Sequence, residues 1–140
     1  DLYTAIIVVS LLTLSCNAKK DLPKSAKEQI IGKWNWVSSS FITRGSPQAK
    51  VNTPQSLGYN ITLIINKKTI EILKNGSSVA TMPYEIIEVE NGKPVLVPAP
   101  IADDFIFYVS SGPIYFKKDE FYISGSYNDA GEDQTFKKAD

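Results

Sequence analysis

The stretch Gly32-Lys33-Trp34-Asn35-Trp36-Val37 decides the fold, because its side chains alternate with a period of two. Trp34 and Trp36 fall on one face of an extended chain, while Lys33 and Asn35 fall on the other. Such alternation is typical of a strand with one buried face. We therefore expect a sheet that packs its tryptophan face inward.

The residues after this stretch predict further short strands joined by hairpins. Residues 59–65 alternate in the same way, and Asn75-Gly76 is the preferred pair for a type I′ turn. Pro98 and Pro100 lack the amide hydrogen of a ladder, so we expect residues 98–100 to stay out of any central strand. Eight or nine antiparallel strands with this spacing indicate a sandwich or barrel. The remaining strands are expected at residues 69–73, 79–89, 95–97, 105–109, 114–116, 121–125 and 134–138.

The region before the first strand has the pattern of an export signal followed by a linker. An apolar run from Leu2 to Leu14 meets Ser15 and then Cys16, and it is shorter than the roughly 20 residues that a membrane-spanning helix needs. The stretch resembles a bacterial lipoprotein signal, which implies lipidation of Cys16; ordinary cleavage, a short uncleaved anchor and a buried helix with an incidental cysteine are the alternatives. No initiator Met precedes the run, so we interpret the chain as truncated at its start.

This interpretation divides the chain into a signal peptide (1–15), a lipidated N-terminus and linker (16–24) and one domain (25–140). Ser25 and Glu28 form a possible capping box, which predicts a short helical turn ahead of the first strand. Because Cys16 is the only cysteine, the domain has no internal disulfide. The 15 basic and 15 acidic residues balance, so we expect no nucleic-acid partner, and we expect a monomer.

Residues 31–37, with Gly-x-Trp on the first strand after a helical turn, resemble the entry to lipocalins and to the lipocalin-like domains of small bacterial lipoproteins. The resemblance extends to residues 53–59 and 121–138. It implies an all-β, up-and-down antiparallel eight-stranded barrel in which Gly32 and Trp34 form a structural motif, Trp34 plugs one end and a cavity opens at the other. Lipocalins usually place a basic residue over this tryptophan. The only arginine, Arg44, lies in a loop, so Lys137, or else Lys138, is expected to take that place.

The barrel interior is the expected site of function. An eight-stranded barrel is just wide enough to be filled by side chains or to hold one small ligand, and both readings stay open. A pocket with aromatic walls and tyrosine hydroxyls would suit an apolar or amphipathic small molecule. Ile61 and Ile86 are expected to line the interior together with the candidate ligand-binding residues, which are Trp36, Tyr59, Tyr84, Phe105, Phe107 and Tyr115.

The sequence contains few side chains that could act as catalytic groups. The chain contains no histidine, which excludes general acid–base catalysis by histidine and catalytic triads that pair a nucleophile with histidine. Asp103-Asp104 would share a proton only in a loop, and we interpret the oxygen-rich residues 127–133 as a hairpin tip, since they do not match an EF-hand. We expect no enzymatic activity, no cofactor and no metal.

Two functional hypotheses follow. The first is a small-molecule binder anchored by its lipid at the cell envelope, as an outer membrane lipoprotein. The second is a filled barrel that acts as an envelope interaction module or inhibitor through its surface, chiefly through the loop of residues 42–55, which is long enough to be functional. A void of roughly 300 Å³ or more would favour the binder. A hydrolase that uses Asp103 or Asp104 is a third hypothesis, which a loss of activity on mutation of either residue would support.

Overall fold

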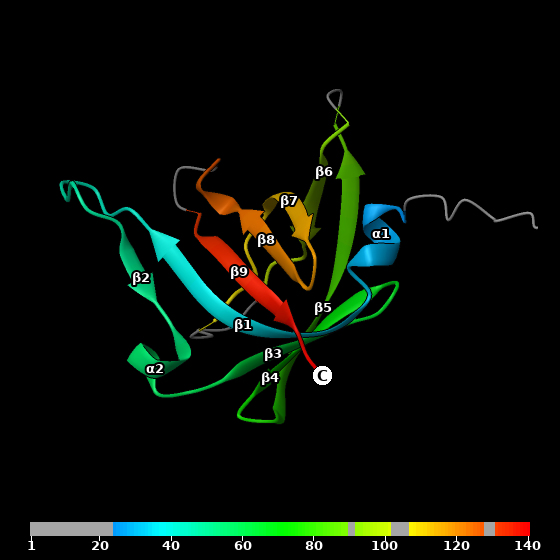
Figure 1. The fold of residues 1–140 in the computed structure, drawn as a ribbon, viewed down its shortest axis with the longest axis horizontal. Helices are drawn as coiled ribbons and strands as arrows, with labels where there is room; N and C mark the ends of the chain where they lie inside the picture. Colours follow the sequence, from blue (N-terminus) through cyan, green and yellow to red (C-terminus); the bar gives the residue numbers. More distant parts are fainter. Residues whose placement is uncertain (1–23, 90–91, 102–106, 128–130) are drawn as a thin grey trace, which may run out of the picture.

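A computed structural model describes residues 24–89, 92–101, 107–127 and 131–140. Within these ranges, nine strands form one antiparallel sheet, and pairing of β1 with β9 closes eight of them into a barrel (Figure 1). The order around the barrel is β1-β3-β4-β5-β6-β7-β8-β9. The strands are β1 (Gly32–Phe41), β2 (Lys50–Asn52), β3 (Ile61–Ile65), β4 (Thr69–Lys74), β5 (Ser77–Glu88), β6 (Pro94–Pro98), β7 (Gly112–Lys117), β8 (Glu120–Ser124) and β9 (Asp133–Lys138). The predicted all-β, up-and-down eight-stranded barrel is thus confirmed.

The expected helical turn also forms, as α1 (Ala26–Gln29). The Ser25 hydroxyl caps it by accepting a hydrogen bond from the backbone amide of Glu28. The turn ends at Ile30, whose side chain is fully buried. In Figure 1, α1 lies beside β5, at the point where the chain enters β1. The helix is therefore packed onto the barrel by the residue that terminates it.

Period-two alternation places the core, as the sequence predicted. In β3, Ile61, Leu63 and Ile65 are buried, and the residues between them are more exposed. The Asn75-Gly76 turn between β4 and β5 has positive φ at both residues (49° and 83°), as a type I′ hairpin requires. Fully burying one such aliphatic side chain stabilises the fold by about 1.5–3 kcal/mol. Local turn chemistry and strand alternation therefore agree in this half of the barrel.

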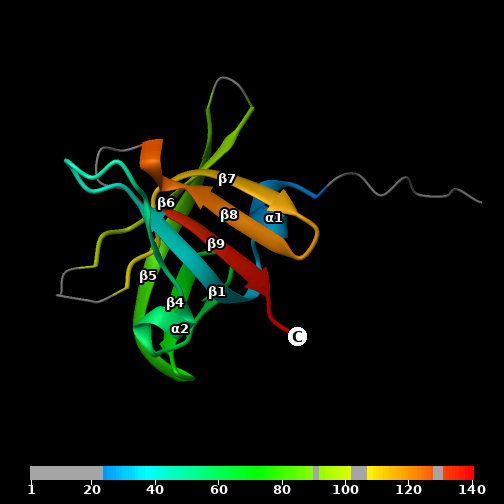
Figure 2. The same cartoon turned by 60° about the vertical axis from the view of Figure 1, so that its left-hand side comes forward.

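Residues 42–55 are not a simple loop. β2 pairs with the second half of β1, and Thr53 caps a second short helix, α2 (Pro54–Leu57), with its side chain. Figure 2 shows this segment projecting beyond the closed part of the barrel. The capping box of α2 holds Thr53 and Ser56 together through reciprocal hydrogen bonds. The predicted loop therefore consists of a turn-containing segment at residues 42–49, the strand β2, which pairs with β1, and the start of α2.

Two predictions about strand boundaries were wrong. Pro98 is the last residue of β6 and lies opposite Tyr84. The Tyr84 amide donates to the carbonyl of Lys68, on the side of β5 that faces away from β6. Tyr84 and Pro98 therefore form a non-hydrogen-bonded pair, and a proline at this position removes no hydrogen bond from the ladder. The predicted strand at residues 105–109 does not form at residues 107–109, which have no regular secondary structure, and its first two residues lie outside the described part of the chain.

Candidate functional site

The Trp34 end of the barrel, defined by Ile30, Trp34, Phe121 and Phe136, is packed with apolar side chains. The Phe121 ring stands edge-on to Trp34 at 4.7 Å between centroids and stacks on Phe136 at 4.9 Å. The Trp34 indole N–H, the polar atom of this ring, donates to the Ile30 carbonyl at 2.8 Å. All four side chains are at most 2% exposed. This end is a core plug.

Gly32 and a basic residue also belong to the Trp34 end. The backbone conformation explains Gly32, and the strand register explains the basic residue. Gly32 has φ of 146°, which favours glycine, and a side chain there would meet the Trp34 indole nitrogen. Lys138, not Lys137, lies over the Trp34 ring, with its ammonium 6.0 Å from the centroid. The assignment of Lys137 was wrong because β9 pairs Lys138 with Trp34 and Lys137 with Asn35.

The Trp36 end, defined by Trp36, Ser39, Tyr59, Phe107 and Glu132, combines aromatic packing with hydrogen bonds. Trp36 is 4% exposed, stacks on Tyr59 at 6.4 Å between centroids and meets the edge of Phe107 at 5.1 Å. Three of the predicted lining residues, Trp36, Tyr59 and Phe107, are thus in contact. The space left among the described residues here is only about 30 Å³, which is room for a water molecule but not for an organic ligand.

A buried amide organises the polar groups at the Trp36 end. Gln134, 1% exposed, accepts a hydrogen bond from the Ser110 amide (2.8 Å) and donates to the Tyr108 carbonyl (2.8 Å) and the Ser39 hydroxyl (3.2 Å). Ser39 also accepts from the Trp36 indole N–H at 3.0 Å. Because Gln134 shares the inward face of β9 with Phe136, strand alternation alone marks it as a buried polar residue.

Glu132 is the ionisable group of this network. Burial raises the pKa of its carboxyl, and hydrogen bonds from the side chains of Ser39 and Tyr108 partly oppose that rise. Burial, together with the negative charge of Glu132, also raises the pKa of the Tyr59 phenol. The buried hydroxyl of Tyr59 has no hydrogen-bond partner among the described residues. The small space beside it therefore suits one bridging water molecule.

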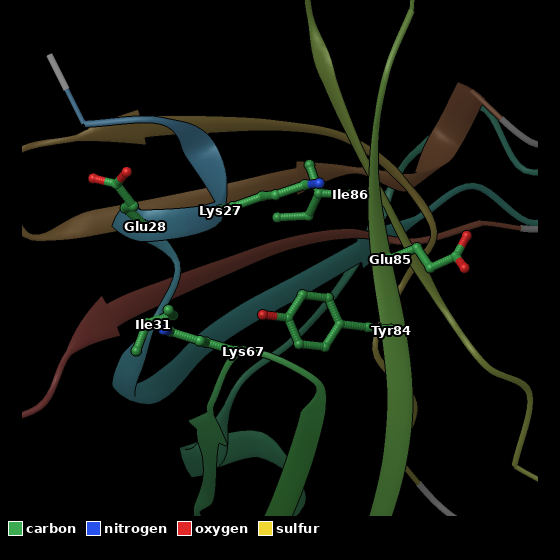
Figure 3. A pocket seen from close by; sticks show the side chains of 7 residues that line it. All are labelled: Lys27, Glu28, Ile31, Lys67, Tyr84, Glu85 and Ile86. Carbon is green, nitrogen blue, oxygen red and sulfur yellow. The ribbon is translucent and has the colours of Figure 1, made fainter.

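A larger hollow lies elsewhere, between α1, β5 and the turn that joins β3 to β4 (Figure 3). We call it the helix groove, and it has a volume of about 540 Å³. The Tyr84 ring points from β5 toward Ile31 and Lys67, and its hydroxyl donates to the carbonyl of Asn66. The groove lies in the volume range of small-molecule sites. Its lining residues are Lys27, Glu28, Ile31, Lys67, Tyr84, Glu85 and Ile86.

The structure thus separates the predicted ligand-binding residues. Trp36, Tyr59 and Phe107 fill the Trp36 end, while Tyr84 lines the helix groove. Tyr115 was wrongly assigned to the interior: it is 36% exposed and stacks on Tyr122 at 5.0 Å, because Ile114 takes the inward position of β7. Phe105 and Cys16 lie outside the described residues.

Sequence reasoning missed Lys27, Ile31 and Lys67. No sequence pattern marks them, because each belongs to a different segment and the groove exists only where α1 packs beside β5. Over the described ranges, no helix is long and apolar enough to cross a membrane. Within the same ranges, no three His, Cys, Asp or Glu side chains gather as metal ligands would.

None of the comparisons, with family models, with curated proteins and with solved structures, found a match for this chain.

Proposed function

We propose that this protein is a lipocalin-like lipoprotein that binds a small amphipathic molecule at the cell envelope without catalysing a reaction. The observation that carries the proposal is the helix groove of about 540 Å³, compared with about 30 Å³ at the Trp36 end. Volumes of roughly 300–1,000 Å³ are typical of ligand sites. The proposed site is therefore the groove beside α1 and not the barrel interior next to Trp36.

The chemistry of the groove supports an amphipathic ligand. Ile31 and Ile86 give it apolar walls, Tyr84 adds an aromatic face, and Lys27 and Lys67 supply charges. Binding sites of small molecules commonly combine such apolar walls with a few polar groups. The envelope location rests on the sequence of residues 1–16, where Ser15 and Cys16 follow an apolar run. Fractionation of the cells that make the protein tests this location.

A binding titration of the full chain with the neutral fluorophore N-phenylnaphthylamine tests the site. Ile31→Trp fills the groove at a position that is 36% exposed, so the fold should tolerate it. Val37→Trp is the matched control, because Val37 is 39% exposed and is not among the groove residues. We expect saturable binding to the wild type and to V37W, and at least tenfold weaker binding to I31W. Equal binding by both variants would place the site elsewhere.

The interaction module remains the second candidate, and one observation favours it. Ile42 and Val51, which lie on the segment from β1 to β2, are 74% and 56% exposed. Apolar side chains exposed together are common at protein interfaces. If N-phenylnaphthylamine fails to bind the wild-type chain, this candidate replaces the binder, and I42S/V51S becomes the variant to compare in partner-binding assays.

A further inference from the structure

The helix groove carries two cationic groups that its carboxylates do not neutralise. Figure 3 shows Lys27 extending from α1 toward β5 and Lys67 extending toward Ile31. The side chains of Glu28 and Glu85 point away from each other, out of the space between α1 and β5. Within the described ranges, neither lysine forms an ion pair. The groove therefore has equal numbers of acidic and basic residues, but the basic groups face its interior.

The apolar part of the groove lies between these two ammonium groups. Ile86 is 8% exposed and belongs to the hydrophobic core, so the groove reaches down to the core. Ile31 is 36% exposed, and the Tyr84 hydroxyl is already engaged with the Asn66 carbonyl. Lysine stems can cover apolar surface while their ammonium groups stay near water. An apolar chain would fit the groove floor, and an anion would fit its rim.

We propose that the ligand of the helix groove is an amphiphile with a single anionic group, which is attracted by both Lys27 and Lys67 and pairs with one of them while the apolar chain packs on Ile31, Tyr84 and Ile86. This inference rests on the proposed function and specifies the ligand class. A cationic amphiphile would meet two like charges, and a neutral one would leave both ammonium groups without a counter-charge. Electrostatic complementarity of this kind mainly sets specificity.

The test is isothermal titration of the full chain with three molecules that share one decyl chain: decanoate, decanol and decylamine. We expect decanoate to bind most tightly, and its affinity to fall as the salt concentration rises. K27Q/K67Q should weaken decanoate binding by about tenfold, as expected for the loss of one charge pair and of a second nearby cation, and leave decanol binding unchanged. Lys50→Gln is the control, because Lys50 lies on β2, away from the groove.

Decanol or decylamine binding as tightly as decanoate would overturn the inference, as would an unchanged decanoate affinity in K27Q/K67Q. Binding of N-phenylnaphthylamine separates these results from failure of the proposed function. If the fluorophore still binds the wild type and is excluded by I31W, the groove is a binding site and only the ligand class is wrong. If neither the fluorophore nor any decyl compound binds, both proposals fail.

A soluble fatty acid and an anionic bilayer lipid both carry an anionic group on an apolar chain, and a further experiment distinguishes these two sources. The chain is mixed with vesicles of phosphatidylglycerol, which is anionic, or of phosphatidylcholine, which has no net charge. If phosphatidylglycerol vesicles displace decanoate from the chain and phosphatidylcholine vesicles do not, a membrane lipid is the source of the anion. Retention of decanoate in both mixtures identifies a free amphiphilic acid.

Discussion

The two ends of this barrel are each built around a tryptophan, yet they are stabilised by different interactions. At the Trp34 end the indole contacts stacked phenylalanines, and its N–H donates to a backbone carbonyl. At the Trp36 end the indole N–H donates to Ser39, which links it to Gln134 and Glu132. Tryptophans two residues apart on one strand face therefore enter an apolar environment and a polar one. The inward orientation of a side chain therefore does not determine whether its surroundings are apolar or polar.

Removing the central aromatic residue of the Trp34 end is expected to have the largest effect. Phe121→Ala leaves a cavity between Trp34 and Phe136, and it should lower the free energy of unfolding by about 4 kcal/mol. Chemical denaturation followed by circular dichroism measures this loss. Tyr122→Ala on the outward face of the same strand is the control, with a loss of less than about 1 kcal/mol. Equal losses in the two variants would contradict the inward packing of β8.

The Trp36 end should be sensitive to a change that keeps side-chain size but removes polarity. Gln134→Leu deprives the Ser110 amide and the Tyr108 carbonyl of their partner, and the expected loss of unfolding free energy is about 3 kcal/mol. The tryptophan emission should change as well, because Ser39 contacts both Gln134 and Trp36. Thr135→Ser on the same strand is the control. A Q134L protein as stable as the wild type would show that the network is dispensable.

The smallest expected effect is the pH dependence contributed by Glu132. Its folded-state pKa is raised above 4.5, so the folded protein binds this proton more tightly than the unfolded chain does. The contribution of Glu132 to stability should therefore be fully present below pH 4.5 and be lost as the pH rises through the raised pKa. Glu132→Gln should remove this contribution and be more stable than the wild type near pH 7. Denaturation at a series of pH values measures it, with Glu120→Gln as an exposed control. An E132Q variant with the same pH dependence of stability as the wild type would contradict the assignment.

The alternation of side chains made the closed barrel predictable, but it did not place every residue. Trp34 and Trp36 could be assigned to one buried face from local sequence, and so could the isoleucines and leucine of β3. Tyr115 could not, because the adjacent Ile114 competes for the inward position and only pairing with β8 fixes the choice. Tyr84 was predicted as a ligand residue, but its neighbours in the groove were not.

By itself, the sequence determined the buried faces of β1 and β3, the Asn75-Gly76 hairpin and the short helical turn after Ser25. Each depends on residues close together in the chain, where alternation, positive φ and capping act locally. Only the tertiary structure decided that Lys138 covers Trp34, that Gln134 joins the Trp36 network and that a groove opens beside α1. These features depend on register and packing between segments that are distant in sequence. Local propensity does not encode such distances.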